Sequence, residues 1–60
     1  YIPLDQVPAV VLNTARQTYP QAQVWAVKME YYNVYEVKMS NMMELYIDVN
    51  GNLLGQDFDD

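Results

Sequence analysis

The stretch QVWAVKMEYYNVYEVKMSNMMELYID, residues 23–48, decides the fold of this chain. An apolar residue stands at every odd position from Trp25 to Tyr31, from Tyr35 to Met39 and from Met43 to Ile47. A period of two is typical of strands that bury one face. The pattern breaks around Asn33 and Asn41, so it predicts three strands, at about residues 23–31, 35–39 and 43–48, joined by tight turns.

The residues before this stretch follow a helical period instead. Val7, Val11 and Ala15 recur at four-residue spacing and predict a helix over about residues 6–19, with these three side chains in its buried stripe. Asp5 is suited to cap the helix, and Pro8 suits a first turn that needs no N–H. A third turn at Asn50-Gly51 leads into a weaker fourth strand at about residues 52–57. The predicted fold is α+β: one N-terminal helix packed on a four-stranded antiparallel meander.

The odd numbering of the apolar residues also constrains the turns. Facing apolar side chains need loops of odd length, and three-residue loops centred on the asparagines satisfy this condition. Such a loop usually places its last residue in the left-handed region, which suits Gly51. Val34 and Met42 would hold the same position at a cost of about 1–2 kcal/mol each, so we expect these two turns to be strained or rebuilt.

This scheme predicts the register of the sheet. It pairs the strands through Tyr31–Tyr35, Met39–Met43 and Ile47–Leu53. It also sets Lys38 opposite Glu44, which is favourable, and sets Lys28 opposite Lys38 and Glu30 opposite Glu36, which is not.

The order of these signals resembles that of the PepSY-like family, whose members are also described as β-lactamase-inhibitor-like. The resemblance runs from about Ile2 to Asp57 and covers one repeat. It is carried by the helix, Tyr19-Pro20, the alternating strand, Tyr35-Glu36-Val37, Ser40-Asn41, Glu44-Leu45, Asp48 and Asn50-Gly51. The resemblance implies a secreted or periplasmic bacterial domain that binds or inhibits a protein of unknown identity, and it implies no catalytic residue.

Three positions depart from the family pattern, which has glycine where this chain has Gln21, Val34 and Met42. Strand-favouring residues in a turn favour extension through the former loop. We therefore predict hinges for strand exchange at Asn33-Val34 and Asn41-Met42, which would give a homodimer.

Length and charge limit the function further. Sixty residues fit one domain, and that size buries a modest core. A net charge of −5 disfavours phosphate backbones and anionic lipid, so we expect no nucleic-acid ligand. No stretch approaches the roughly 20 apolar residues of a membrane span, so we expect no membrane insertion.

Catalytic chemistry has few residues to use, because the chain has no His, no Cys and a single serine, Ser40. We expect no enzyme activity and no cofactor, since nucleophilic schemes need a base beside the nucleophile. Glu30 and Glu36 could share a proton across the first hairpin, although exposed charges explain them equally well.

The run from Asp48 to Asp59 is spaced like a calcium loop, but Leu53 stands where that loop needs a sharp glycine turn. An Asn-Gly hairpin is the stronger interpretation, and no metal site is predicted.

The aromatic residues divide between the two faces of the predicted sheet. Trp25, Tyr31 and Tyr35 fall on the face expected to pack against the helix. Tyr32, Tyr46 and Met42 fall on the other face, among charged residues, and are either ordinary surface or a partner surface.

Two functions remain open at this point. The first is a non-enzymatic protein-binding or inhibitory module of the bacterial cell envelope. The second is a structural, self-associating domain formed by strand exchange, which would also fit an engineered chain.

Overall fold

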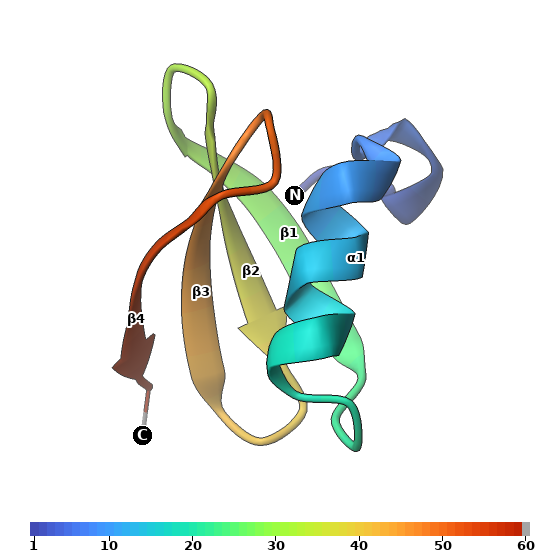
Figure 1. Ribbon diagram of the computed structural model, residues 1–60, viewed down its shortest axis with the longest axis vertical. Coiled ribbons are helices and arrows are strands. Elements are labelled where there is room, and N and C mark those ends of the chain that lie inside the picture. The colour runs from blue at the N-terminus through green and yellow to red at the C-terminus, as the bar shows by residue number, and fades with distance from the viewer. Residues whose placement is uncertain (60) are drawn as a thin grey trace.

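The computed structural model, described here for residues 1–59, is a single helix packed on one face of a four-stranded sheet (Figure 1). A 3-10 turn η1 (Leu4–Gln6) precedes α1 (Ala9–Thr18). The strands are β1 (Val24–Tyr31), β2 (Val34–Met39), β3 (Met43–Asp48) and β4 (Leu53–Phe58). All neighbouring strands are antiparallel, in the order β1-β2-β3-β4. The predicted α-β-β-β-β meander is therefore confirmed.

The helix is shorter than the predicted range of residues 6–19. Val7 is extended, with ψ of 135°, and Pro8 is the N-cap with ψ of 137°, so α1 begins only at Ala9. Asp5 lies in η1, and no side chain caps α1. The physical reason is the proline, which restricts the residue before it to extended backbone. The predicted cap at Asp5 was wrong.

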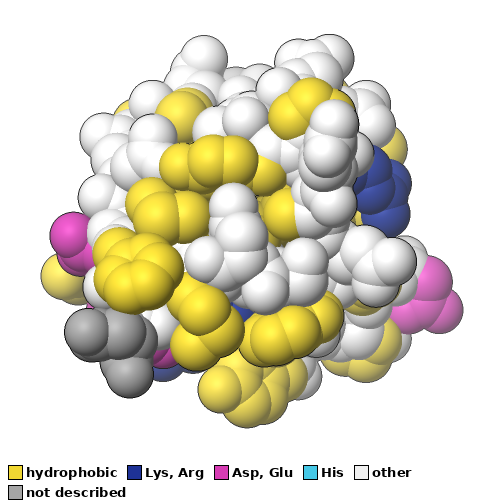
Figure 2. All heavy atoms as spheres, turned by 90° about the horizontal axis from the view of Figure 1, so that it is seen from below, with side chains coloured by type: hydrophobic (Ala, Val, Ile, Leu, Met, Phe, Trp, Pro, Cys, Tyr) yellow, Lys and Arg dark blue, Asp and Glu magenta, His cyan; other side chains and the backbone are white. Residues whose placement is uncertain are grey.

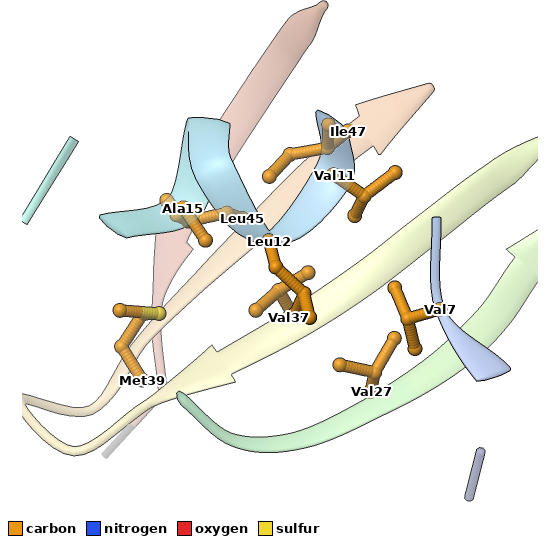
Figure 3. Packing of buried hydrophobic residues seen from close by; sticks show 9 residues of the cluster. All are labelled: Val7, Val11, Leu12, Ala15, Val27, Val37, Met39, Leu45 and Ile47. Carbon is orange, nitrogen blue, oxygen red and sulfur yellow. The ribbon is translucent and has the colours of Figure 1, made fainter. Parts of the chain in front are cut away.

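The core lies between α1 and the sheet, as Figure 3 shows. The three residues of the predicted stripe, Val7, Val11 and Ala15, are all buried and Leu12 joins them, although Val7 lies before the start of α1. The sheet contributes apolar side chains from one of its faces to the same cluster: Val27, Val37, Met39, Leu45 and Ile47.

Two of the three aromatic residues assigned to the core lie outside it. Trp25 is 58% exposed and Tyr31 is 67% exposed, whereas Tyr35 packs against the core as predicted. The β1–β2 ladder shifts between Val24 and Ala26 and again between Met29 and Tyr31. At the first shift Val24 packs on the core and Trp25 has no partner on β2. A bulge of this kind moves side chains off the strict alternation.

The β1–β2 register differs from the predicted one by two residues. Lys28 pairs with Glu36 instead of Lys38, and Met29 pairs with Tyr35. The expected like-charge pairs of Lys28 with Lys38 and Glu30 with Glu36 are thereby replaced by an attractive pair. Parity is kept, because a slip of two residues leaves every side chain on its own face.

This slip also moves the first turn along the chain. Asn33, with φ of 62°, takes the left-handed position, and Val34 begins β2. Asparagine tolerates that conformation better than a β-branched residue does. Of the two outcomes expected for this turn, strain or rebuilding, the structure shows rebuilding, because Asn33 and not Val34 has the left-handed backbone.

The other two turns follow the predicted scheme. Met42 has φ of 73° and Gly51 has φ of 88°. The β2–β3 register sets Lys38 opposite Glu44, and Ile47 pairs with Leu53, as expected. Past Ile47 the β3–β4 ladder shifts by one residue, so that Leu45 pairs with Gln56.

Candidate protein-binding face

The face of the sheet that turns away from α1 carries two rows of polar side chains. Because Val27, Val37 and Leu45 point into the core, their neighbours along each strand point to the opposite face. One row runs across the sheet as Lys28, Glu36, Tyr46 and Gly55, and the next runs as Ala26, Lys38, Glu44 and Asp57. We call these two rows the open face.

Ion pairs within each row, and from each row to an acidic residue beside it, hold the long side chains in place. Lys28 Nζ lies 3.8 Å from Glu36 Oε2 and 3.9 Å from Glu30 Oε2. Lys38 Nζ lies 3.8 Å from Glu44 Oε2 and also contacts the Asp59 carboxylate. Each lysine is therefore shared by two acidic residues, which leaves the face acidic. Ion pairs this exposed add little stability, but several together limit the rotamers of a surface.

The close spacing of the carboxylates shifts their pKa values. Burial raises the pKa of Glu36 above its ordinary value, and the neighbouring Glu30 carboxyl raises it further. A hydrogen bond with Asp59 raises the pKa of Glu44, whereas the Lys38 ammonium lowers the pKa of Asp59. The structure thus brings Glu30 and Glu36 together beside Lys28, as the hypothesis of a shared proton required.

Tyr46 lies at the centre of the open face and is half-buried. Desolvation and the surrounding carboxylates, Glu36 first among them, raise the pKa of its phenol. Its cross-strand partner on β4 is Gly55, and a Cβ added there would meet no atom within 4 Å. The ring of Tyr46 therefore has an empty flank on the β4 side. A neutral phenol among fixed charges beside an empty flank is suited to contact another protein.

The three residues predicted as a partner surface do not lie together. Tyr46 is central, while Tyr32 and Met42 lie in turns at opposite ends of β2. Tyr32 is 89% exposed, in the first turn. The prediction assumed that side chains continue to alternate between the two faces through the turns. Residues in turns do not follow this alternation. The sequence placed Tyr46 among charged residues on this face, and what it missed is that Lys28 lies opposite Glu36, because that pairing depends on the register of the first hairpin.

The predicted hinge residues have unequal backbones. Asn33 and Met42 are left-handed, whereas Val34 is an ordinary β2 residue. Asn41 holds its turn through its side chain, since its Oδ1 accepts a hydrogen bond from the Met43 N–H at 3.1 Å. Of the four positions, Met42 is the one that combines a left-handed backbone with a long side chain.

The third turn uses the residues that had been considered for calcium. Asp48 Oδ1 accepts hydrogen bonds from the backbone N–H groups of Asn50 and Asn52, both at 2.9 Å. Asp48 Oδ2 accepts one from Asn52 Nδ2 at 3.0 Å. Asp59 lies at the other end of β3, where its N–H donates to Met42. Across residues 1–59, no three potential ligands of the His, Cys, Asp or Glu type are grouped to hold a metal ion.

A hollow of about 420 Å³ opens at the end of the molecule that Figure 2 shows, where hydrophobic side chains gather. Ser40 lies on its wall, and its Oγ accepts the Gln23 N–H at 2.9 Å. The Ser40 hydroxyl therefore links the segment before β1 to the turn after β2. The hollow is lined by Tyr19, Pro20, Gln21, Ala22, Ser40 and Asn41, so it brings no acid or base to the serine.

Comparison with known proteins gives one match. A family model described as "Putative beta-lactamase-inhibitor-like, PepSY-like" matches residues 1–55. No curated protein and no solved structure matches the chain. In the described part of the chain, neither helical segment is long and apolar enough to cross a membrane.

Proposed function

Because the chain belongs to the β-lactamase-inhibitor-like, PepSY-like family, we propose that it is a non-enzymatic module of the bacterial cell envelope that binds or inhibits another protein. The observation that carries this proposal is the open face, where a central tyrosine lies among charged side chains held by shared ion pairs. A helix covers the other face of the sheet, which leaves the open face available to a partner.

The charge of the open face indicates the chemistry of the partner. Glu36, Glu44 and Asp57 outnumber Lys28 and Lys38 on it, and Glu30 and Asp59 add negative charge beside it. A partner with a basic surface would therefore associate faster and be favoured over an acidic one. Tyr46 is the residue that we expect to contribute most to affinity, since interface hot spots favour tyrosine in a desolvated position.

The test is a binding experiment with a matched pair of variants. The chain is immobilised and used to capture proteins from a periplasmic extract. Each captured protein is then purified and titrated against the wild-type chain, Tyr46→Ala and Gln17→Ala. Gln17 is exposed on the outer side of α1, so its substitution is the control. We expect saturable binding that weakens at least about tenfold in Tyr46→Ala and stays unchanged in Gln17→Ala.

Panels of β-lactamases and peptidases assayed with the same proteins test inhibition. The proposal fails if no captured protein binds saturably and no enzyme is inhibited. It also fails if both variants bind like the wild type.

The second candidate function is self-association by strand exchange, which the left-handed backbone of Met42 favours. Opening the β2–β3 turn would release the strain of about 1 kcal/mol that a non-glycine residue bears there. Met42→Gly removes this strain and should convert an exchanged dimer to monomer. A dimer that persists in Met42→Gly after unfolding and refolding would exclude exchange at this turn.

A further inference from the structure

The β3–β4 turn contains an asparagine followed by glycine, which is a sequence prone to deamidation. In that reaction the backbone nitrogen of the following residue attacks the side-chain carbonyl of the asparagine, a C–N bond forms and ammonia leaves. Water then opens the cyclic imide and gives either aspartate or isoaspartate. A following glycine favours the attack, because it has no side chain in the way and its backbone is the least restricted. Asn50-Gly51 is the one such pair in the sequence.

The structure distinguishes Asn50 from the other asparagines of the chain. A side chain follows each of the others and hinders the attack, since the pairs are Asn13-Thr14, Asn33-Val34, Asn41-Met42 and Asn52-Leu53. The side chains of Asn41 and Asn52 are also held by hydrogen bonds, to the Met43 N–H and to the Asp48 carboxylate. Asn50 is exposed, and within residues 1–59 its side-chain amide makes no hydrogen bond. It is therefore free to turn toward Gly51.

The attacking nitrogen, in contrast, is held in place by Asp48. The Gly51 N–H donates to the Asp48 carbonyl at 2.9 Å, and the Asn50 N–H donates to the Asp48 carboxylate at 2.9 Å. The Gly51 nitrogen must lose its proton before it attacks, so its hydrogen bond to the Asp48 carbonyl has to break. The nearby negative charge of Asp48 opposes the loss of that proton. The turn must therefore open locally before Asn50 reacts.

The β3–β4 turn also lies directly against α1 (Figure 1). The Thr14 hydroxyl donates to the Gly51 carbonyl at 2.5 Å, and a Cβ on Gly51 would lie 3.1 Å from the Val10 carbonyl oxygen. Isoaspartate carries the main chain through its side chain, which adds a methylene group between positions 50 and 51. A turn that is held by Asp48 on one side and by α1 on the other has no room for a longer main chain. Aspartate leaves the length of the main chain unchanged.

We propose that Asn50 is a deamidation site that the folded β3–β4 turn protects, and that isoaspartate formed there prevents the turn from closing against α1. Asn50 reacts while the turn is open, and isoaspartate then keeps the turn open. Either product also adds a negative charge beside Asp48.

The first test is the site and the rate of deamidation in the 60-residue chain. The chain is incubated in mildly alkaline buffer, folded or unfolded in guanidinium chloride, and peptide mapping by mass spectrometry locates the product. We expect Asn50 to react at least about tenfold faster than any other asparagine. The folded chain should react at least about fivefold more slowly than the unfolded chain. Faster reaction at another asparagine, equal rates in the two states, or no reaction at Asn50 overturns the proposal.

Asp48→Ala tests the source of the protection, and Asp57→Ala on β4 is its control because it removes the same charge outside the turn. Circular dichroism establishes that each variant is folded. Asp48→Ala should deamidate at Asn50 at least about fivefold faster than the wild type, and Asp57→Ala should match the wild type. If Asp48→Ala does not fold, Asp48→Asn takes its place and should also react faster. A folded Asp48 variant with the wild-type rate contradicts the protection by Asp48.

The effect of isoaspartate is tested with two chemically synthesised chains of equal charge, one with isoaspartate at position 50 and the other Asn50→Asp. The N–H groups of Asp48 and Gly51 are hydrogen bonded within the turn, so their amide exchange by NMR reports its opening. Exchange at both should be at least about tenfold faster in the isoaspartate chain, and exchange at the core residue Val37 should rise less. Equal exchange in the two chains, or an equal rise at all three amides, overturns the proposed effect on the turn.

Discussion

At the scale of single residues, Gly51 has the most stringent environment in the chain. Its φ is 88°, and a Cβ there would lie 3.1 Å from the Val10 carbonyl oxygen and 3.3 Å from Thr14 Oγ1. The Thr14 hydroxyl donates to the Gly51 carbonyl at 2.5 Å, so the β3–β4 turn rests directly on α1. Glycine is required here for the backbone conformation and for the close approach of the helix.

We therefore expect Gly51→Ala to lower the free energy of unfolding by about 2 kcal/mol or more, from the left-handed backbone and the crowding together. Gly55→Ala is the control, because a Cβ at Gly55 meets nothing within 4 Å. It should stay within about 0.5 kcal/mol of the wild type. Urea unfolding followed by circular dichroism measures both, and similar losses in the two variants would contradict this account.

The three turns also differ in which residue has the left-handed backbone. Parity required odd loops, but it did not determine which residue closes each one. In the first turn, a register slip of two residues places Asn33 in the left-handed position, so Val34 does not have to adopt it. The second turn keeps Met42 there, because the β2–β3 register holds Val37 opposite Leu45 in the core.

At the scale of elements, the β3–β4 hairpin is organised by the carboxylate of Asp48. Hydrogen bonds from Asn52, through its backbone and its side chain, lower the pKa of Asp48 below its ordinary value of 3.8, and the Asn50 N–H acts in the same direction. A depressed pKa means that the folded state favours the charged form. The stabilisation is present above the ordinary pKa and is lost as the pH falls through the lowered pKa of the folded state.

Asp48→Asn keeps an acceptor for the turn and removes its titration. We expect the urea midpoint of the wild type to fall more than that of Asp48→Asn when the pH is lowered from about 6 to about 2.5. Asp59 and the other acidic residues titrate in both proteins, so the difference isolates Asp48. Parallel pH profiles would show that the hairpin does not depend on this charge.

At the scale of the whole molecule, stability depends on a core that comprises nine of the residues in the described range 1–59. A chain of this size is expected to have about 3–9 kcal/mol of stability in total. Each fully buried side chain is therefore a large fraction of it.

Leu45→Ala should lower the free energy of unfolding by about 3 kcal/mol, since Leu45 of β3 is fully buried in the core between the sheet and α1. Trp25→Ala should cost less than about 1 kcal/mol, because Trp25 is 58% exposed. Circular dichroism in urea is the appropriate measurement, because Trp25 is the one tryptophan. A Trp25 variant as unstable as Leu45→Ala would place the tryptophan in the core after all.

The order of elements, the alternation of the strands and the buried helix stripe were predictable from the sequence, because each depends on neighbours within one turn or one strand. The predicted start of the helix was wrong because of a local effect: Pro8 restricts Val7 to extended backbone, so the helix begins at Ala9. The alternation of the strands was enough to place Lys28, Glu36 and Tyr46 on one face, but it could not set Lys28 opposite Glu36, since that pairing depends on the register of the first hairpin.

Apolar periodicity determined by itself that this chain is a helix followed by a meander, with a period of two in residues 23–48 and a helical spacing in the residues before them. Tertiary structure alone decided which even register the first hairpin adopts, and thereby whether like or opposite charges meet on the open face. Parity leaves several registers allowed, and the choice among them depends on total packing and turn strain. Trp25 and Tyr31 lie outside the core because the register shifts between β1 and β2 interrupt the alternation of side chains along β1.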